Sequence, residues 1–135
     1  MTTFDRVEAM VLAWPETSST PSYGGFHALR VNKSLFARLR GEMQDDLDDL
    51  TGEPYGEVLM VRVGDLGEKE ALLADDPEVF FTVPHYDGYA GILVRLARVE
   101  EGVLRELLLD AFVRTAPKRA VRAWQEQFGP LPGGE

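Results

Sequence analysis

The chain has 135 residues, enough for one domain with a single core, and 44% of them are apolar, as in ordinary globular proteins. It contains no cysteine, which excludes disulfides, thiolate metal sites and cysteine nucleophiles together. The formal net charge of −9 disfavours nucleic acid as a partner unless basic residues gather on one face.

The acidic residues of this acidic protein are concentrated in the middle of the chain. The segment 42–78 holds 13 acidic and 2 basic residues, a local net charge of −11, whereas the remainder holds 12 basic and 10 acidic residues, a net charge of +2. No apolar run reaches the ~18 residues of a membrane span, and the sequence does not open with a secretory signal. We therefore expect a cytoplasmic protein with no membrane partner.

The sequence begins with an amphipathic pattern. Apolar residues recur three or four positions apart over residues 4–14, which predicts a helix with Thr3 as its N-cap and Pro15 ending it. Residues 16–25 are rich in Ser, Thr, Pro and Gly and therefore predict a loop.

The next part predicts three strands. Residues 26–31 and 35–40 form two of them, joined by a turn at Asn32, and residues 57–63 form the third. The acidic residues 41–56 between the second and third strands predict a long connection. Asn32 tolerates the left-handed backbone conformation that a tight turn requires.

The second half predicts helices and strands in alternation. Residues 65–74 form a short helix, and residues 79–83 and 90–96 form two strands with a turn at Asp87-Gly88. An apolar stripe over residues 104–112 predicts the next helix. Pro117 opens the last helix, because proline is tolerated in a first turn.

The predicted order is helix, three strands, helix, two strands and two helices, within one domain spanning residues 1–135. Short turns between neighbouring strands favour a mainly antiparallel, five-stranded sheet with helices on one face. The predicted fold class is thus two-layer α+β. The second face of the sheet remains uncovered in this prediction.

Four stretches stand out together, in the order residues 12–17 (LAWPET), 26–39 (FHALRVNKSLFARL), 76–89 (DPEVFFTVPHYDGY), and 93–96 (LVRL) with 104–108 and 116–119. In this order they resemble the MmcQ/YjbR family of small bacterial proteins. Asn32 stands where that family would have a glycine in the first hairpin turn. The resemblance implies a two-layer fold likened to secretion-chaperone-like or double-wing arrangements, a DNA-binding label, and no catalytic residues.

Strand parity places several arginines on the uncovered face. In residues 35–40 the apolar set is Leu35, Ala37 and Leu39, which leaves Arg38 and Arg40 on the opposite side with Phe36. The same alternation in the third and fifth strands sets Arg62 and Arg95 against their apolar neighbours. A second basic group lies on and just before the last helix and consists of Arg114, Lys118, Arg119 and Arg122. The candidate nucleic-acid contacts are Lys33, Arg38, Arg40, Arg62, Arg95, Arg119 and Arg122.

An alternative hypothesis gives these arginines no part in binding nucleic acid. They are either paired with carboxylates of the acidic segment 42–78 or simply solvated, as most exposed arginines are. The sequence does not decide between phosphate contacts and these alternatives.

His85 and Tyr86 lie beside the Asp87-Gly88 turn and form a candidate ligand contact. The alternative is that the His85 ring holds the turn together. The acidic residues near Asp46 fail the calcium-loop spacing, and two histidines without cysteine do not make a zinc site, so we expect no metal and no cofactor. No nucleophile elbow or phosphate loop occurs.

The sequence therefore favours a non-enzymatic binding module, with DNA as the ligand that the resemblance implies. The alternative is a protein-interaction or self-associating module. A small-molecule site or hydrolase at His85 is the third hypothesis.

Overall fold

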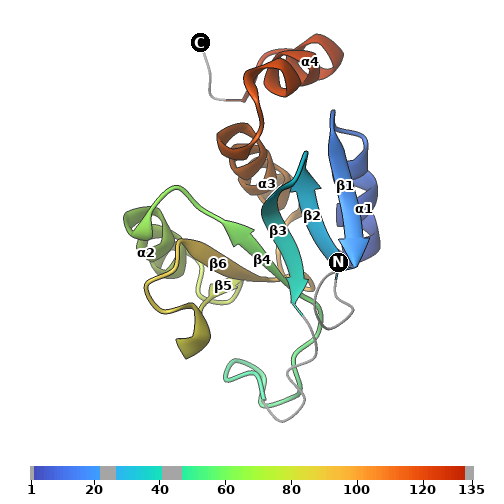
Figure 1. The fold of residues 1–135 in the computed structure, drawn as a ribbon. Coiled ribbons are helices and arrows are strands. Elements are labelled where there is room, and N and C mark those ends of the chain that lie inside the picture. The colour runs from blue at the N-terminus through green and yellow to red at the C-terminus, as the bar shows by residue number, and fades with distance from the viewer. Residues whose placement is uncertain (1, 22–26, 41–46, 133–135) are drawn as a thin grey trace.

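The computed structural model describes residues 2–21, 27–40 and 47–132 (Figure 1). Phe26, where the first predicted strand began, and residues 42–46 of the acidic segment lie outside them. The first helix, α1 (Phe4–Leu12), begins as predicted, because the Thr3 hydroxyl accepts a hydrogen bond from the backbone N–H of Arg6 at 3.3 Å.

The strands form one antiparallel sheet in the order β1-β2-β3-β4-β6-β5. The α+β prediction is confirmed, but the sheet has six strands rather than five. The strands are β1 (Thr17–Pro21), β2 (His27–Val31), β3 (Ser34–Arg40), β4 (Val58–Arg62), β5 (Phe80–Phe81) and β6 (Gly91–Arg95).

The additional strand is β1, in the segment predicted as a loop. It lies at the sheet edge and pairs only with β2. The Thr17 hydroxyl donates hydrogen bonds to the carbonyls of Val11 at 2.7 Å and Trp14 at 2.9 Å, which ties the start of β1 to the end of α1. A polar strand containing proline is stable at this edge because only one side of it needs ladder partners.

The predicted strand over residues 79–83 is shorter in the structure. Its strand residues are only Phe80 and Phe81, which form β5 and pair with β6, and a 3₁₀ turn, η2 (Pro84–Tyr86), follows. Gly88 has φ 76°, which confirms a turn at Asp87-Gly88 that needs glycine. Asn32 has φ 55°, so the first hairpin turn keeps the left-handed residue that the sequence predicted.

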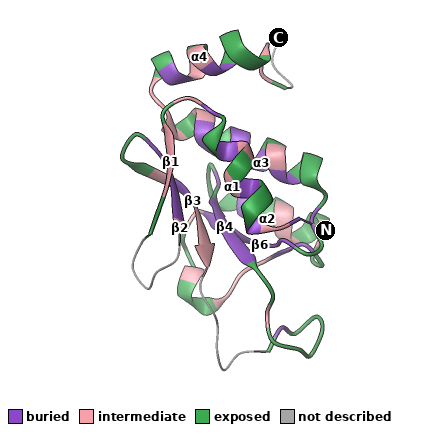
Figure 2. Cartoon of the chain, turned by 90° about the vertical axis from the view of Figure 1, so that its right-hand side faces the viewer, coloured by how far each residue is buried: buried purple, intermediate pink, exposed green. Residues whose placement is uncertain are grey.

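The helices pack on one face of the sheet, and together they form the main core. α3 (Glu101–Thr115) lies against β3 and β4, α1 lies against β1, and α2 (Leu66–Asp75) lies against β5 and β6. Figure 2 shows the buried residues concentrated where the sheet and α3 meet. The last helix, α4 (Lys118–Phe128), buries Ala120 and Trp124. Within the described residues, no helix is both long and apolar enough to cross a bilayer.

A β-bulge in β3 reverses the predicted sides of Leu35 and Phe36, whereas Ala37 and Leu39 face the main core as predicted. Leu29 pairs with Ala37 but Arg30 pairs with Leu35, so Phe36 is the extra residue. Phe36 therefore faces the helices, fully buried, with its ring centroid 6.2 Å from that of Phe112. Leu35 packs instead in a smaller apolar cluster with Met60 and its neighbours. The prediction that Phe36 shares the Arg38 face is wrong.

Candidate functional site

The second face of the sheet carries a small apolar cluster as well as arginines. Val58, Met60 and Leu93 are its buried centre. Partly buried side chains from adjoining loops pack against them, and the rings of Tyr55 and Phe81 stack at 5.3 Å between centroids. This face is therefore less open than the sequence predicted.

The predicted alternation of β4 and β6 is confirmed. Leu59, Val61, Ile92 and Val94 belong to the main core under the helices. The residues between them, including Arg62 and Arg95, consequently lie on the second face.

Arg95 forms a buried ion pair with the acidic segment. Its Nε and Nη2 donate to the two carboxylate oxygens of Asp48, each at 2.7 Å, and its Nη1 donates to the carbonyls of Pro77 and Glu78. The guanidinium also lies 4.2 Å from the ring centroid of Phe81. These hydrogen bonds hold the pKa of Asp48 below its usual value. Arg95 therefore pairs with a carboxylate of the acidic segment, as the alternative hypothesis predicted, and its charge is not free for a phosphate.

The other basic residues on this side of the sheet have a different environment. Arg40 lies with its guanidinium 5.4 Å from the ring centroid of Tyr86, and Arg38 is half-buried. Arg30 donates to the carbonyl of Lys33 at 3.3 Å. Among the described residues, no carboxylate lies within 4.0 Å of Arg30, Lys33 or Arg62.

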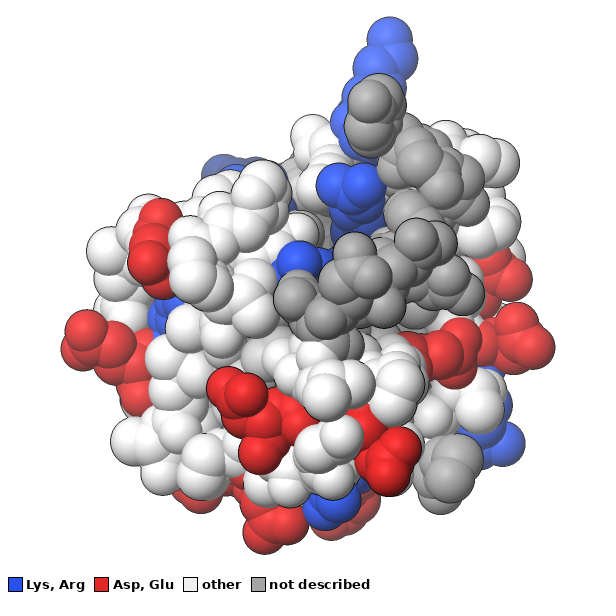
Figure 3. Space-filling model, turned by 90° about the horizontal axis from the view of Figure 1, so that it is seen from below, with Lys and Arg blue, Asp and Glu red and all other residues white. Residues whose placement is uncertain are grey.

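Basic side chains gather in one area of the surface seen from below. Figure 3 shows Lys and Arg atoms in the upper centre of this view, and further Lys and Arg atoms beside Asp and Glu atoms at its left, bottom and lower right. A local concentration of positive charge therefore exists in a chain whose net charge is −9.

The two candidate contacts on α4, Arg119 and Arg122, differ in their surroundings. Arg119 pairs with Glu16, with Nη2 2.8 Å from Oε1, and this hydrogen bond lowers the pKa of Glu16. Arg122 is exposed. Neither residue lies on the sheet face that carries Arg62.

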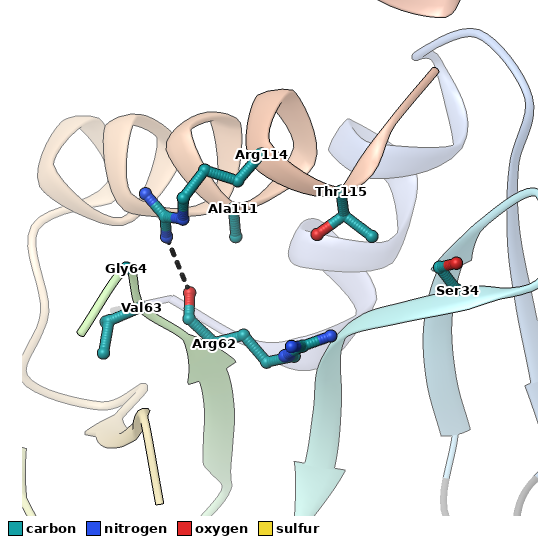
Figure 4. Close-up of a pocket in the computed structure, with 7 residues that line it drawn as sticks. All are labelled: Ser34, Arg62, Val63, Gly64, Ala111, Arg114 and Thr115. Carbon is teal, nitrogen blue, oxygen red and sulfur yellow. Dashed lines mark hydrogen bonds between the residues drawn. The ribbon is translucent and has the colours of Figure 1, made fainter. Parts of the chain in front are cut away.

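A hollow of about 300 Å³ lies where the β2–β3 hairpin and the end of β4 meet α3. Figure 4 shows Arg62 and Arg114 on its wall, together with the hydroxyls of Ser34 and Thr115. Arg114 Nη2 donates to the Arg62 carbonyl at 3.0 Å. One arginine from each basic group of the sequence thus meets at this hollow.

His85 is exposed, and its ring packs edge-on against Tyr86 with centroids 5.0 Å apart. No described residue hydrogen-bonds the His85 ring. The turn is held instead by Lys69 of α2, whose Nζ donates to the carbonyls of Tyr86 at 2.7 Å and Tyr89 at 2.9 Å. Lys69 is only 6% exposed. Sequence reasoning missed this role because no local pattern marks a buried lysine.

Ser19, His27 and Glu8 form a polar cluster that the sequence did not predict. The Ser19 hydroxyl donates to Glu8 Oε2 at 2.6 Å and lies 3.2 Å from His27 Nδ1. Glu8 Oε2 is 3.7 Å from the same ring nitrogen. In a catalytic triad the serine and the acid contact opposite ring nitrogens. This cluster therefore does not have the geometry that activates a serine.

Among the described residues, no group of three or more His, Asp or Glu side chains is placed to hold a metal ion. Asp110, which lies near Arg114 on α3, has its pKa raised by burial.

The sheet and its helices define a small α+β protein, and comparisons with known proteins identify its family. A YjbR family model matches residues 12–113, and the chain belongs to the YjbR family. Uncharacterized proteins of Mycobacterium bovis and Mycobacterium tuberculosis are 40% identical over 133 residues, covering 96% of this chain and all of each relative.

A solved structure shares the fold. The crystal structure of a Deinococcus radiodurans protein with a DUF419 domain aligns at a TM-score of 0.65 and 21% identity, covering 100% of this chain and 96% of that protein. At this identity the similarity concerns the fold alone.

Proposed function

We propose that this protein is a non-enzymatic binding module that contacts DNA phosphates through the basic side chains on the second face of its sheet. The observation that carries the proposal is the absence of carboxylates within 4.0 Å of Arg30, Lys33 and Arg62 among the described residues. Guanidinium groups without an acid partner retain donors for phosphate oxygens. The double-wing likeness implied by the family resemblance supports the same ligand.

The overall negative charge sets the conditions for such binding. Repulsion between the acidic segment and DNA opposes the phosphate contacts, and salt screens charges beyond about 8 Å at physiological ionic strength. Each phosphate neutralised contributes a slope of about −0.9 to the dependence of log affinity on log salt concentration. Binding through a few arginines should therefore be salt-dependent and of modest strength.

The test is fluorescence anisotropy of a labelled DNA duplex titrated with the protein across a salt series. Reversal of Arg30 and Arg62 to Glu should weaken binding at least about tenfold and reduce the salt slope by about 2. The matched control reverses Arg6 and Arg98, which changes the net charge equally but affects residues already paired with Glu101 and Glu78. Equal affinities of the two double variants would contradict the proposal.

The non-enzymatic part of the proposal is supported by the polar clusters. Ser19 and Glu8 share one ring nitrogen of His27, and His85 is exposed without a hydrogen-bonded partner among the described residues. Neither arrangement prepares a nucleophile or general base. An esterase or phosphatase screen in which hydrolysis is lost in His85→Ala or Ser19→Ala would overturn this part.

A self-associating module is the second candidate, favoured by exposed apolar side chains in the loop beside the second apolar cluster. Leu47 is 58% exposed and Leu50 is 40% exposed. Sedimentation velocity over a concentration series should then show a dimer that Leu47→Lys abolishes. A monomer at every concentration would remove this candidate.

A further inference from the structure

The hollow at the end of the sheet is lined by residues that carry two guanidinium groups and two hydroxyl groups. In Figure 4 the Arg114 guanidinium points toward the Arg62 carbonyl, whereas the Arg62 side chain extends toward β3, so the two guanidiniums border the hollow on different sides. Its wall is formed by Ser34, Arg62, Arg114 and Thr115, and its volume is about 300 Å³ (Figure 4). Val63 and Ala111 supply apolar surface between them.

The fold brings these groups together from three elements. Positions 111, 114 and 115 are spaced to share one face of α3, so Ala111, Arg114 and Thr115 all line the hollow. Ser34 is the first residue of β3, placed by the left-handed turn residue Asn32. Arg62 is the last residue of β4.

Most hydrogen-bond donors of the two arginines have no acceptor among the residues that the structure describes. A guanidinium has five N–H groups. Among the described residues, Arg62 donates one hydrogen bond, to the carbonyl of Leu35 at 3.2 Å, and Arg114 donates one, to the carbonyl of Arg62. The remaining donors, with the Ser34 and Thr115 hydroxyls, match an oxyanion that accepts several hydrogen bonds.

Two acids near the hollow lower its positive potential without pairing with its arginines. Glu68 Oε2 accepts a hydrogen bond from the backbone N–H of Gly64 at 2.9 Å. Asp110 lies one helical turn before Arg114 on α3. Neither carboxylate is within 4.0 Å of Arg62 or Arg114. These two acids oppose the binding of any anion, so the preference for a dianion over a monoanion comes from the two guanidinium charges.

We infer that this hollow binds a phosphate group bearing two negative charges, as in inorganic phosphate or a phosphate monoester. The two guanidiniums supply the charge, and the two hydroxyls donate to the remaining oxygens. This site differs from the proposed DNA face: it is a small enclosure shared with α3, and three of its four polar residues are not among the proposed DNA contacts.

The test is a titration of the uniformly ¹⁵N-labelled full chain with inorganic phosphate, followed by amide NMR shifts at constant ionic strength. We expect saturable shifts in the millimolar range at Ser34, Gly64 and Thr115. Sodium chloride at equal ionic strength should not produce them. If chloride produces the same shifts, or phosphate produces none, the inference is wrong.

Variants test the geometry. Arg114→Gln should weaken phosphate binding about tenfold or more, because a charged donor is lost. Arg122→Gln on α4 is the matched control and should leave the affinity unchanged. Thr115→Val removes only a hydroxyl and should weaken binding several-fold in a chain whose amide spectrum shows an intact fold. Unchanged affinity in both Arg114→Gln and Thr115→Val would overturn the site.

Two further arms separate this site from the DNA proposal. Glu68→Gln removes a nearby negative charge and should tighten phosphate binding several-fold, and no change would count against the site. If a DNA duplex shifts these amides but free phosphate does not, the phosphate site is refuted while DNA binding stands. If phosphate binds saturably and the duplex shows no affinity at low salt, the phosphate site stands and the DNA proposal fails.

Discussion

Arg95 and Arg62 show how differently two arginines on the same face of one sheet can be used. They lie at opposite ends of the paired strands β4 and β6, since Val58 pairs with Arg95 and Arg62 pairs with Gly91. Arg95 is only 9% exposed, whereas Arg62 is exposed and lines a hollow.

The difference comes from the segments that pack over the two ends of β4 and β6. The loop from Asp48 to Pro54 closes over Arg95 and supplies a carboxylate with two hydrogen bonds. At the other end, the backbone of Arg62 accepts a hydrogen bond from another arginine, Arg114. Strand alternation thus determines which face a residue occupies, and distant segments determine whether its charge is available.

The largest expected effect is the loss of the buried ion pair. Asp48→Ala leaves the guanidinium of Arg95 buried with only carbonyl partners, so the free energy of unfolding should fall by about 3–5 kcal/mol. Urea denaturation followed by circular dichroism measures it. Asp49→Ala is the matched control, because Asp49 is exposed and carries the same charge. Similar losses in both variants would show that the pair does not anchor the loop.

The same pair should make stability depend on acid. The hydrogen bonds from Arg95 lower the pKa of Asp48 in the folded state below its unfolded value. Their contribution is therefore complete above the unfolded pKa, about 4, and is lost as pH falls through the lower folded pKa. The stability difference between wild type and Asp48→Asn should shrink below about pH 4. Urea melts over a pH series test this, and a difference that stays constant would contradict it.

A smaller effect is expected at Lys69, a buried cation with no carboxylate within 4.0 Å in the part of the chain that the structure describes. Lys69→Met keeps the apolar stem but removes the hydrogen bonds to the Tyr86 and Tyr89 carbonyls. The loss should be about 1–2 kcal/mol, since both carbonyls belong to residues that water partly reaches. Amide exchange at Tyr89 should accelerate more than in an Ala71→Met control. Unchanged exchange would mean that Lys69 does not hold the turn.

The predictable parts of this fold depend on local patterns. The alternation of β4 and β6 placed Arg62 and Arg95 correctly, and Asn32 identified a left-handed turn. The edge strand β1 was missed because its Ser, Thr and Pro residues resemble a loop, and its stability comes from pairing with β2. The bulge at Phe36 was missed because an extra residue resets the parity without any sequence mark.

The candidate site was less predictable than the fold. Asp48 and Arg95 are 47 residues apart, and Arg62 and Arg114 are 52 apart. Neither pair follows a helical or strand spacing, so only the folded chain brings its members together. Sequence patterns predicted two separate basic groups, and the folded chain brings Arg62 of the first and Arg114 of the second to one hollow.

The smallest change in stability is expected at Arg62, and it gives the most direct comparison with Arg95. Arg62→Gln removes an exposed charge whose only described hydrogen bond is to the Leu35 carbonyl. Its free energy of unfolding should stay within about 0.5 kcal/mol of wild type, as for most surface substitutions. Arg95→Gln, the same change on the same face, should lower the free energy of unfolding several times more, because it leaves the buried carboxylate of Asp48 without its cation. Parallel urea melts decide this: a large loss in Arg62→Gln would mean that Arg62 holds the fold together, and a stability-neutral change would leave its charge available for a ligand.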